Sequence, residues 1–320
     1  MSFRRLSYSL SVSALALLAL PQIAQACSGC GCTLSTDEGS LGQGDEPGFR
    51  VDGRFDYIDQ RDHRQGNAKS DVGTPQANGN EAEHDTRNRL FTLGLDYAPN
   101  QDWGVNLAIP LLNRKHETYQ PDMNGDYQLL TSNWAELSDI RVMGRYQGLT
   151  ESKNYGVTFG LKLPTGGTKT DFGGGNGQLD RSLQPGTGTT DGIIGLTQRG
   201  QFTDQFGWFA TQTFQRAFNE HVDYRPGSTF NANVGVRYVI NETFTPQFQI
   251  NAQNKWRDSG ANADTVNSGG ELVYLSPGLS VNLSRDTSAY GFVQVPVYNR
   301  VGGIQLTPAY TASIGLSHKF

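Results

Sequence analysis

The chain has 320 residues, a formal net charge of −5 and a mean hydropathy of −0.50, with 39 Gly and only three Cys and three Met. No stretch after residue 30 reaches the ~20 apolar residues that a transmembrane helix needs, which excludes a helical membrane protein. The weakly negative charge and the absence of a long basic run argue against nucleic acid as a partner. The composition favours one large β-structure over two soluble domains.

The N-terminus has the three parts of a secretory signal peptide. Arg4–Arg5 supply the positive start, Leu10–Leu20 form a short apolar run, and Ala24–Ala26 form a small-x-small cleavage site. We therefore expect residues 1–26 to be removed on export, so that the mature chain begins at Cys27. Acylation of Cys27 is the alternative, but Ala24 stands where a lipoprotein signal is expected to have Leu.

All three cysteines follow this site in the sequence CSGCGC, as Cys27, Cys30 and Cys32. Their thiolates could bind a soft metal ion such as copper or zinc, with the α-amine of Cys27 as a fourth ligand. In an oxidising periplasm two of them could instead form a disulfide, leaving the third free or joined to a periplasmic thiol or metal protein. No His follows the Cys-x-x-Cys, so it is not a c-type haem site. We expect residues 27–48 to form a periplasmic tail.

Twelve segments after this tail have strand-like composition with turn residues between them. Most have the ~9–11 residues that a tilted transmembrane strand requires. In chain order they are 49–58, 90–97, 103–110, 139–149, 155–163, 192–199, 206–216, 230–240, 244–256, 271–283, 289–298 and 306–320.

The connections between these segments alternate long and short. The long ones are 59–89, 111–138, 164–191, 217–229, 257–270 and the more modest 299–305, whereas the short ones are 98–102, 150–154, 200–205, 241–243 and 284–288. Outer-membrane barrels have long outer loops, short periplasmic turns, an even strand number and both termini in the periplasm. A soluble sandwich or lipocalin-like barrel has no reason to sort its loops by length.

The two faces of each segment also differ. Phe91, Leu93 and Leu95 alternate with Thr92 and Asp96, as expected for an apolar exterior in lipid and a polar interior in water. Aromatic residues near the segment ends predict the two interfacial girdles. They are Tyr97, Trp103, Tyr155, Trp208, Tyr238, Phe244, Trp256 and Tyr290.

The last segment ends on Phe320, and it looks like the closing strand and assembly signal of bacterial outer-membrane barrels. Outer-membrane lipid and the barrel-assembly machinery of a Gram-negative bacterium are therefore expected partners. We predict one transmembrane antiparallel up-and-down β-barrel of about twelve strands, residues 49–320.

The polar faces place charges of both signs in the lumen. These charges could select which solutes pass, or they could neutralise one another and brace a narrow barrel. Twelve strands lie between the ~8 whose interior is filled and the ~16–18 of wide porins, so a narrow porin-like channel is expected. The candidate lining residues are Arg50, Arg54, Asp56, Asp96, Arg141, Arg145, Lys162, Arg237 and Lys255.

Catalytic chemistry has no readable signal. The Gly-rich stretch 171–191 lacks a phosphate-loop pattern and matches no regular calcium loop, which favours a flexible outer loop or an inward-folded constriction. His63, His84, His116 and His221 fall in predicted loops, and no Ser/His/Asp arrangement can be read from the sequence. We expect no catalytic residues and a protein that is not an enzyme.

Five stretches together resemble an outer-membrane "transporter" family named for the phenol meta-cleavage degradation pathway. They are LAIPLLNR (107–114), LSDIRVMGRY (137–146), GLKLPTG (160–166), PGTGTTD (185–191) and VPVYNRVGGIQLTP (295–308). The resemblance implies an outer-membrane barrel that moves small solutes, with aromatic compounds suggested by the family name. We therefore expect a channel or transporter for small solutes with a narrow polar lumen. The alternative is a metal- or thiol-redox-linked barrel that uses the N-terminal cysteines.

Overall fold

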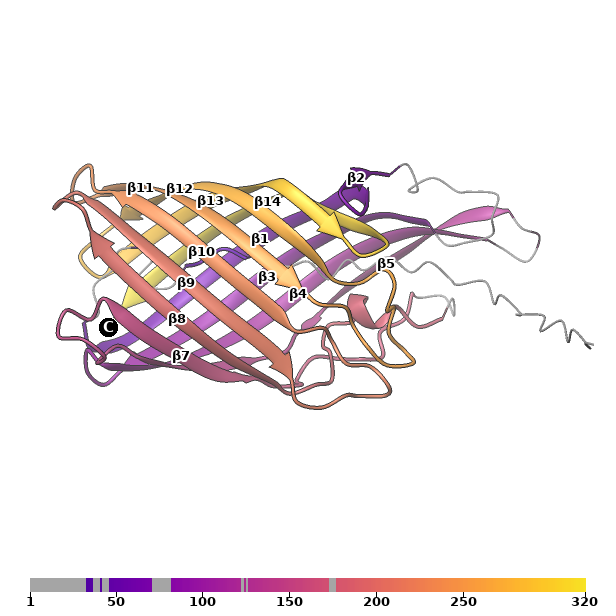
Figure 1. The fold of residues 1–320 in the computed structure, drawn as a ribbon, viewed down its shortest axis with the longest axis horizontal. Helices are drawn as coiled ribbons and strands as arrows, with labels where there is room; N and C mark the ends of the chain where they lie inside the picture. Colours follow the sequence, from indigo (N-terminus) through magenta and orange to yellow (C-terminus); the bar gives the residue numbers. More distant parts are fainter. Residues whose placement is uncertain are drawn as a thin grey trace, which may run out of the picture.

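The computed structural model describes residues 33–36, 41, 46–70, 82–121, 124, 126–172 and 177–320. The predicted signal peptide and the three cysteines lie outside these residues. The chain forms an elongated all-β barrel with strongly tilted strands (Figure 1). Its elements are β1 Gly48–Gln65, β2 Ala68–Lys69, β3 Ala82–Ala98, β4 Trp103–Pro121, β5 Tyr127–Leu137, β6 Arg141–Tyr146, β7 Tyr155–Lys162, the 3₁₀ helix η1 Arg181–Leu183, β8 Asp191–Gln201, β9 Phe206–Ala217, β10 Thr229–Tyr238, β11 Phe244–Lys255, β12 Gly270–Asn282, β13 Thr287–Val301 and β14 Ile304–Lys319.

The barrel closes between its first and last long strands. β1 and β14 pair antiparallel from Arg50 opposite Lys319 to Gln65 opposite Ile304. At the end of this seam the Phe320 amide donates to the Phe49 carbonyl over 2.8 Å, and the two rings pack with centroids 5.9 Å apart. Closure leaves no open sheet edge, which a spanning β-structure requires.

Twelve strands surround the lumen, as predicted. β2 only extends β1 as a two-residue strand. β5 and β6 pair with successive parts of β4, residues 111–121 and 103–108, and together they occupy one position in the barrel. The architecture is therefore a closed 12-stranded antiparallel β-barrel.

The outer face carries a continuous apolar surface. Side chains such as Phe91, Val105, Ile194, Val234 and Ile314 point away from the lumen and are 46–63% exposed. A soluble protein would not leave so many large apolar side chains in water, whereas lipid accepts them. The predicted apolar-out, polar-in alternation is confirmed, and the barrel spans a membrane. No helix in the described part of the chain is long and apolar enough to cross a membrane.

The short and the long connections lie at opposite ends of the barrel. Residues 99–102, 147–154, 202–205, 239–243 and 283–286 connect strands at the end that also holds Gly48 and Lys319. The longer connections, including 163–190, 218–228 and 256–269, lie at the opposite end. One predicted loop, 299–305, is instead a tight turn in which Gly302 and Gly303 connect β13 to β14. Gly303 adopts φ +60°, a left-handed conformation that glycine accepts without strain.

A second predicted loop, 111–138, is largely strand. β4 continues to Pro121 and pairs with β5, and together with the start of β3 they form a hairpin extension beyond the barrel, defined here as residues 82–89, 113–121 and 127–136 (Figure 1). Outward-facing Phe91 and Leu111 give way to Arg89, Lys115 and Glu117 along these strands. The extension therefore lies beyond the apolar band. Both faces of the extension carry polar residues, so its sequence lacks the apolar–polar alternation that predicts the other strands.

Candidate functional site: the barrel lumen

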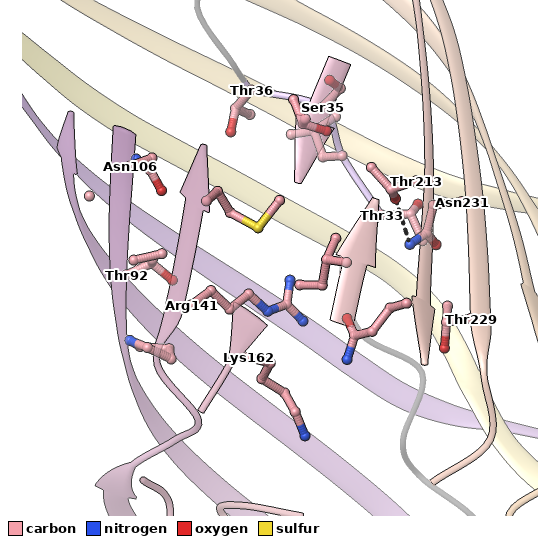
Figure 2. A pocket seen from close by; sticks show the side chains of 18 of the residues that line it. Thr33, Ser35, Thr36, Thr92, Asn106, Arg141, Lys162, Thr213, Thr229 and Asn231 are labelled. Carbon is pink, nitrogen blue, oxygen red and sulfur yellow. Dashed lines mark hydrogen bonds between the residues drawn. The ribbon is translucent and has the colours of Figure 1, made fainter. Parts of the chain in front are cut away.

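The lumen encloses a cavity of about 790 Å³. Figure 2 shows polar side chains from several strands converging on it, among them Arg141 and Lys162. Of the nine lining residues predicted from the sequence, seven line this cavity: Arg50, Arg54, Asp96, Arg141, Arg145, Lys162 and Lys255. Asp56 lies fully buried behind Arg54, and Arg237 lies on the inner face of β10 but not among the residues that line the cavity. Their effect on solute passage stays a prediction.

Several of these charges form ion pairs. Lys162 of β7 lies 3.1 Å from carboxylate oxygens of both Asp139 and Asp191, and all three side chains are almost fully buried. Asp191 faces Lys162 directly across the β7–β8 ladder. The Asp139 carboxylate also accepts from the Thr187 amide over 3.0 Å, which ties the loop 163–190 to the wall. This cluster fits the bracing interpretation, because each buried charge has a partner.

The side of the lumen formed by β11, β12 and β13 is filled by amide and hydroxyl side chains. Asn251 lies at the centre of this network: its Nδ2 donates to Gln249 over 3.1 Å, and its Oδ1 accepts from Ser276 over 2.5 Å and from Gln294 over 3.3 Å. All four side chains are essentially inaccessible. Buried amides are stable here only because their donors and acceptors are paired.

Part of the N-terminal segment lies inside the barrel. Gln249 exchanges two hydrogen bonds with the Ser35 backbone, Gln294 donates to Thr33 over 3.3 Å, and Arg54 donates to Thr36 over 2.9 Å. The prediction of a periplasmic tail for residues 27–48 does not describe residues 33–36 and 41, which occupy the lumen. The remaining tail up to residue 45, with Cys27, Cys30 and Cys32, lies outside the described residues.

An apolar cluster inside the lumen holds this segment. Leu34 and Leu41 pack with Tyr290 and Phe292 of β13, and all four are at least nine-tenths buried. Tyr290 was expected in an outer aromatic girdle, but it points inward and donates to Asp52 over 3.3 Å. β13 is apolar on both faces, since Val293 faces lipid. The presence of apolar residues on both faces of β13 is therefore the feature of the sequence that could have predicted an apolar contact inside the barrel.

Residues 177–190, in the connection between β7 and β8, fold over the cavity at the end with the long connections. Leu179 and Leu183 pack against Leu112 and Trp134, with Leu90 and Phe172 at the edge. Of the two alternatives expected for 171–191, a flexible outer loop or an inward-folded constriction, the described residues 177–190 show the inward fold, and their effect on solute passage stays a prediction. Asp180 caps η1 by accepting from the Ser182 amide over 2.7 Å, and Arg114 donates to the Ser182 carbonyl over 3.3 Å. Burial raises the pKa of Asp180 above its ordinary value.

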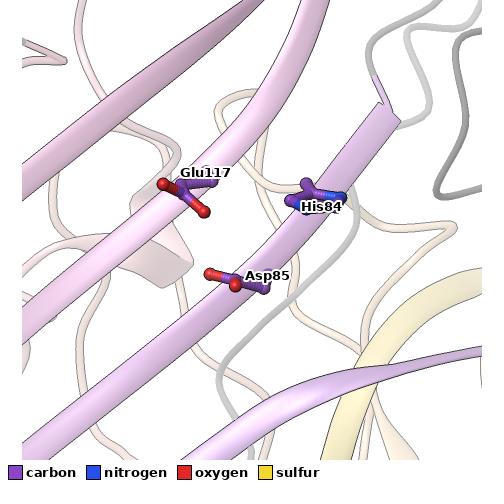
Figure 3. A group of neighbouring side chains, drawn as sticks. All are labelled: His84, Asp85 and Glu117. Atoms are coloured by element: carbon purple, nitrogen blue, oxygen red, sulfur yellow. The ribbon is translucent and has the colours of Figure 1, made fainter.

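His84, Asp85 and Glu117 gather on the hairpin extension, with one ligand atom of each within 4.8 Å of the others (Figure 3). Among the described residues this is the one group of three His, Cys, Asp or Glu side chains at such distances. Arg87 lies 2.7 Å from Asp85, and Lys115 lies 2.5 Å from Glu117. Each of the two carboxylates therefore already forms an ion pair with a cation, and the group is a set of ion pairs on β3 and β4.

The histidines do not form a catalytic arrangement in the described part of the chain. His63, His84 and His116 lie in strands, contrary to the prediction that they fall in loops, because β1, β3 and β4 extend further than expected. His116 is fully buried, and its Nδ1 contacts the Thr86 hydroxyl at 2.8 Å. His221 is the exception, in the connection between β9 and β10.

Comparison with solved structures shows where this fold recurs. The chain is similar to the COG4313 outer membrane channel from Pseudomonas putida F1, with a TM-score of 0.65 and 10% identity over 89% of this chain and all of that one. Looser similarity, at a TM-score of 0.48, relates it to the CymD monoaromatic hydrocarbon channel, with 10% identity over 93% of this chain and 97% of that chain. No family model and no curated protein matches the sequence. At this identity the similarity shows the fold, that of outer-membrane β-barrels.

Proposed function

We propose that the protein is a channel of the outer membrane that passes small solutes through its lumen. One observation carries this proposal: a cavity of about 790 Å³ lined by both polar and apolar side chains, enclosed by a barrel whose outer face is apolar. A barrel that served only as an anchor could fill its interior with side chains. The similar fold of the COG4313 outer membrane channel supports the same function by analogy.

The two ends of the cavity suggest a narrow path. Residues 33–36 and 41 of the N-terminal segment occupy part of the lumen beside β11 and β13, and residues 177–190 pack at the end with the long connections. We place the short turns and both chain ends in the periplasm and the hairpin extension outside the cell, as in other barrels of this kind. Solutes would then enter beside the loop 163–190 and leave past the N-terminal segment.

Solute uptake into liposomes tests the proposal. Proteoliposomes containing the purified full chain should take up radiolabelled small solutes, and the rate should fall steeply with solute size because the cavity is narrow. Liposomes carrying protein that was heat-denatured before reconstitution provide the background. Uptake equal to this background for every solute in the series would overturn the proposal.

A further inference from the structure

The cavity has more positive than negative charge, although the whole chain carries a net charge of −5. Among the described residues that line it are ten Lys and Arg but only four Asp. Three of the cations pair with carboxylates outside this lining, as Arg54 does with Asp56, Lys153 with Asp102 and Lys255 with Asp258. Even with these three carboxylates counted, the cations remain in excess. A narrow passage with excess positive charge concentrates anions.

Arg141 differs from the other lining cations. Its neighbour across the β6–β7 ladder, Lys162, is held between two aspartates, and Arg145 lies 3.7 Å from Asp96. The Arg141 guanidinium points into the cavity (Figure 2), and no hydrogen bond or ion pair to it occurs within the described part of the chain. A guanidinium presents a planar fork of donors that matches a carboxylate with two parallel hydrogen bonds.

An apolar surface lies beside this guanidinium. Arg141, Lys162 and Asp191 face inward side by side on β6, β7 and β8. The next inward-facing residues on these strands are Met143, Gly160 and Ile193. Gly160 has no side chain, and a Cβ there would lie 2.5 Å from the Met143 Sδ, so the thioether covers the glycine. Met143 and Ile193 both line the cavity. A polarizable thioether and a branched aliphatic group suit a flat apolar body.

We propose that Arg141, Met143 and Ile193 form a binding site for small organic monocarboxylates, on the path that the proposed channel function requires. The carboxylate accepts from the Arg141 guanidinium, and the apolar body lies against Met143 and Ile193. The site thus assigns a substrate class, amphipathic monoanions, to the lumen.

Equilibrium binding to the purified full chain in detergent micelles tests this site without requiring passage. Isothermal titration with benzoate should give saturable binding, whereas benzyl alcohol, its neutral analogue, should bind at least about tenfold more weakly. Arg141→Gln should weaken benzoate binding by about tenfold or more and leave benzyl alcohol unchanged. Arg89→Gln, which removes a cation from the outer face of β3, should bind benzoate like the wild type.

The outcomes separate this site from the channel function. Equal benzoate affinity in the Arg141→Gln and wild-type proteins, or equal affinity for benzoate and benzyl alcohol, would overturn the site even if liposomes take up solutes. Arg141-dependent binding without any solute uptake would leave the site standing and remove the channel. Should Arg141→Gln fail to fold, Arg141→Lys keeps the charge but loses the fork, and it should still bind benzoate more weakly than the wild type. Unchanged affinity in that variant would also overturn the site.

Discussion

Gln249 of β11 and Ser35 of the N-terminal segment form two reciprocal hydrogen bonds: the Ser35 amide donates to Gln249 Oε1 over 3.3 Å, and Gln249 Nε2 donates to the Ser35 carbonyl over 3.0 Å. Gln249 thus pairs with a backbone as a neighbouring strand would. Because its side chain is fully buried in the lumen, this pair fixes part of the segment inside the barrel.

Replacing this side chain should loosen the segment. Gln249→Ala removes both hydrogen bonds, each worth about 0.5–1.5 kcal/mol, and leaves the Ser35 backbone groups to seek water. We expect more frequent open states in planar bilayers. Gln253→Ala is the matched control, because Gln253 lies on the same face of β11 and donates to Asn231 instead. Equal open probability in the two variants would contradict the role assigned to Gln249.

The sequence predicted the barrel because lipid imposes a rule on every spanning strand. Each strand must place apolar residues outside, so Phe91 and Val105 revealed their strands. Beyond the apolar band this rule no longer applies, and the β4–β5 extension was predicted as a loop. Lys115 and Glu117 there face outward and pair with each other rather than with lipid.

The position of the N-terminal segment could not be predicted, because contacts such as that between Ser35 and Gln249 join residues far apart in the chain. Ser and Thr suit a solvated tail as well as a polar lumen. The inward positions of Arg141 and Lys162 followed from alternation alone. Lys162 lies between two aspartates, whereas Arg141 faces the cavity. This difference depends on the fold of the connection between β7 and β8, which alternation does not predict.

Lys162 should be important for stability. Lys162→Met removes the cation that forms ion pairs with the buried Asp139 and Asp191 carboxylates, and breaking such a buried pair costs about 3–5 kcal/mol. We expect a clear drop in the temperature at which the folded band converts to the unfolded band in gel electrophoresis. Adding Asp191→Asn should recover part of the loss, since one uncompensated charge is removed. A single variant as stable as the wild type would show that the cluster does not brace the wall.

Docking of the loop 163–190 should depend on pH through Asp180. Burial raises the pKa of Asp180 above the ordinary value of 3.8, and the hydrogen bonds with Ser182, which lower the pKa, offset only part of this rise. A raised pKa in the docked state means that docking is favoured at low pH and weakened as the pH rises through that pKa. Channel opening should therefore be rarer at about pH 4 than at about pH 7.

Asp180→Asn should flatten this response, because an amide does not titrate. Asp204→Asn, a change at an exposed carboxylate in the short turn 202–205, should keep it. If the response persists unchanged in Asp180→Asn, another group controls the pH dependence.

Single-channel conductance of the full chain and of a variant lacking residues 33–45 tests whether the lumen is a solute channel. We expect small, intermittent conductance for the full chain and larger, steadier conductance for the deletion, because residues 33–36 and 41 line the cavity and their removal widens it. A deletion variant that folds and inserts but conducts no better than lipid alone would contradict the channel function, since the barrel would then hold no path for a solute.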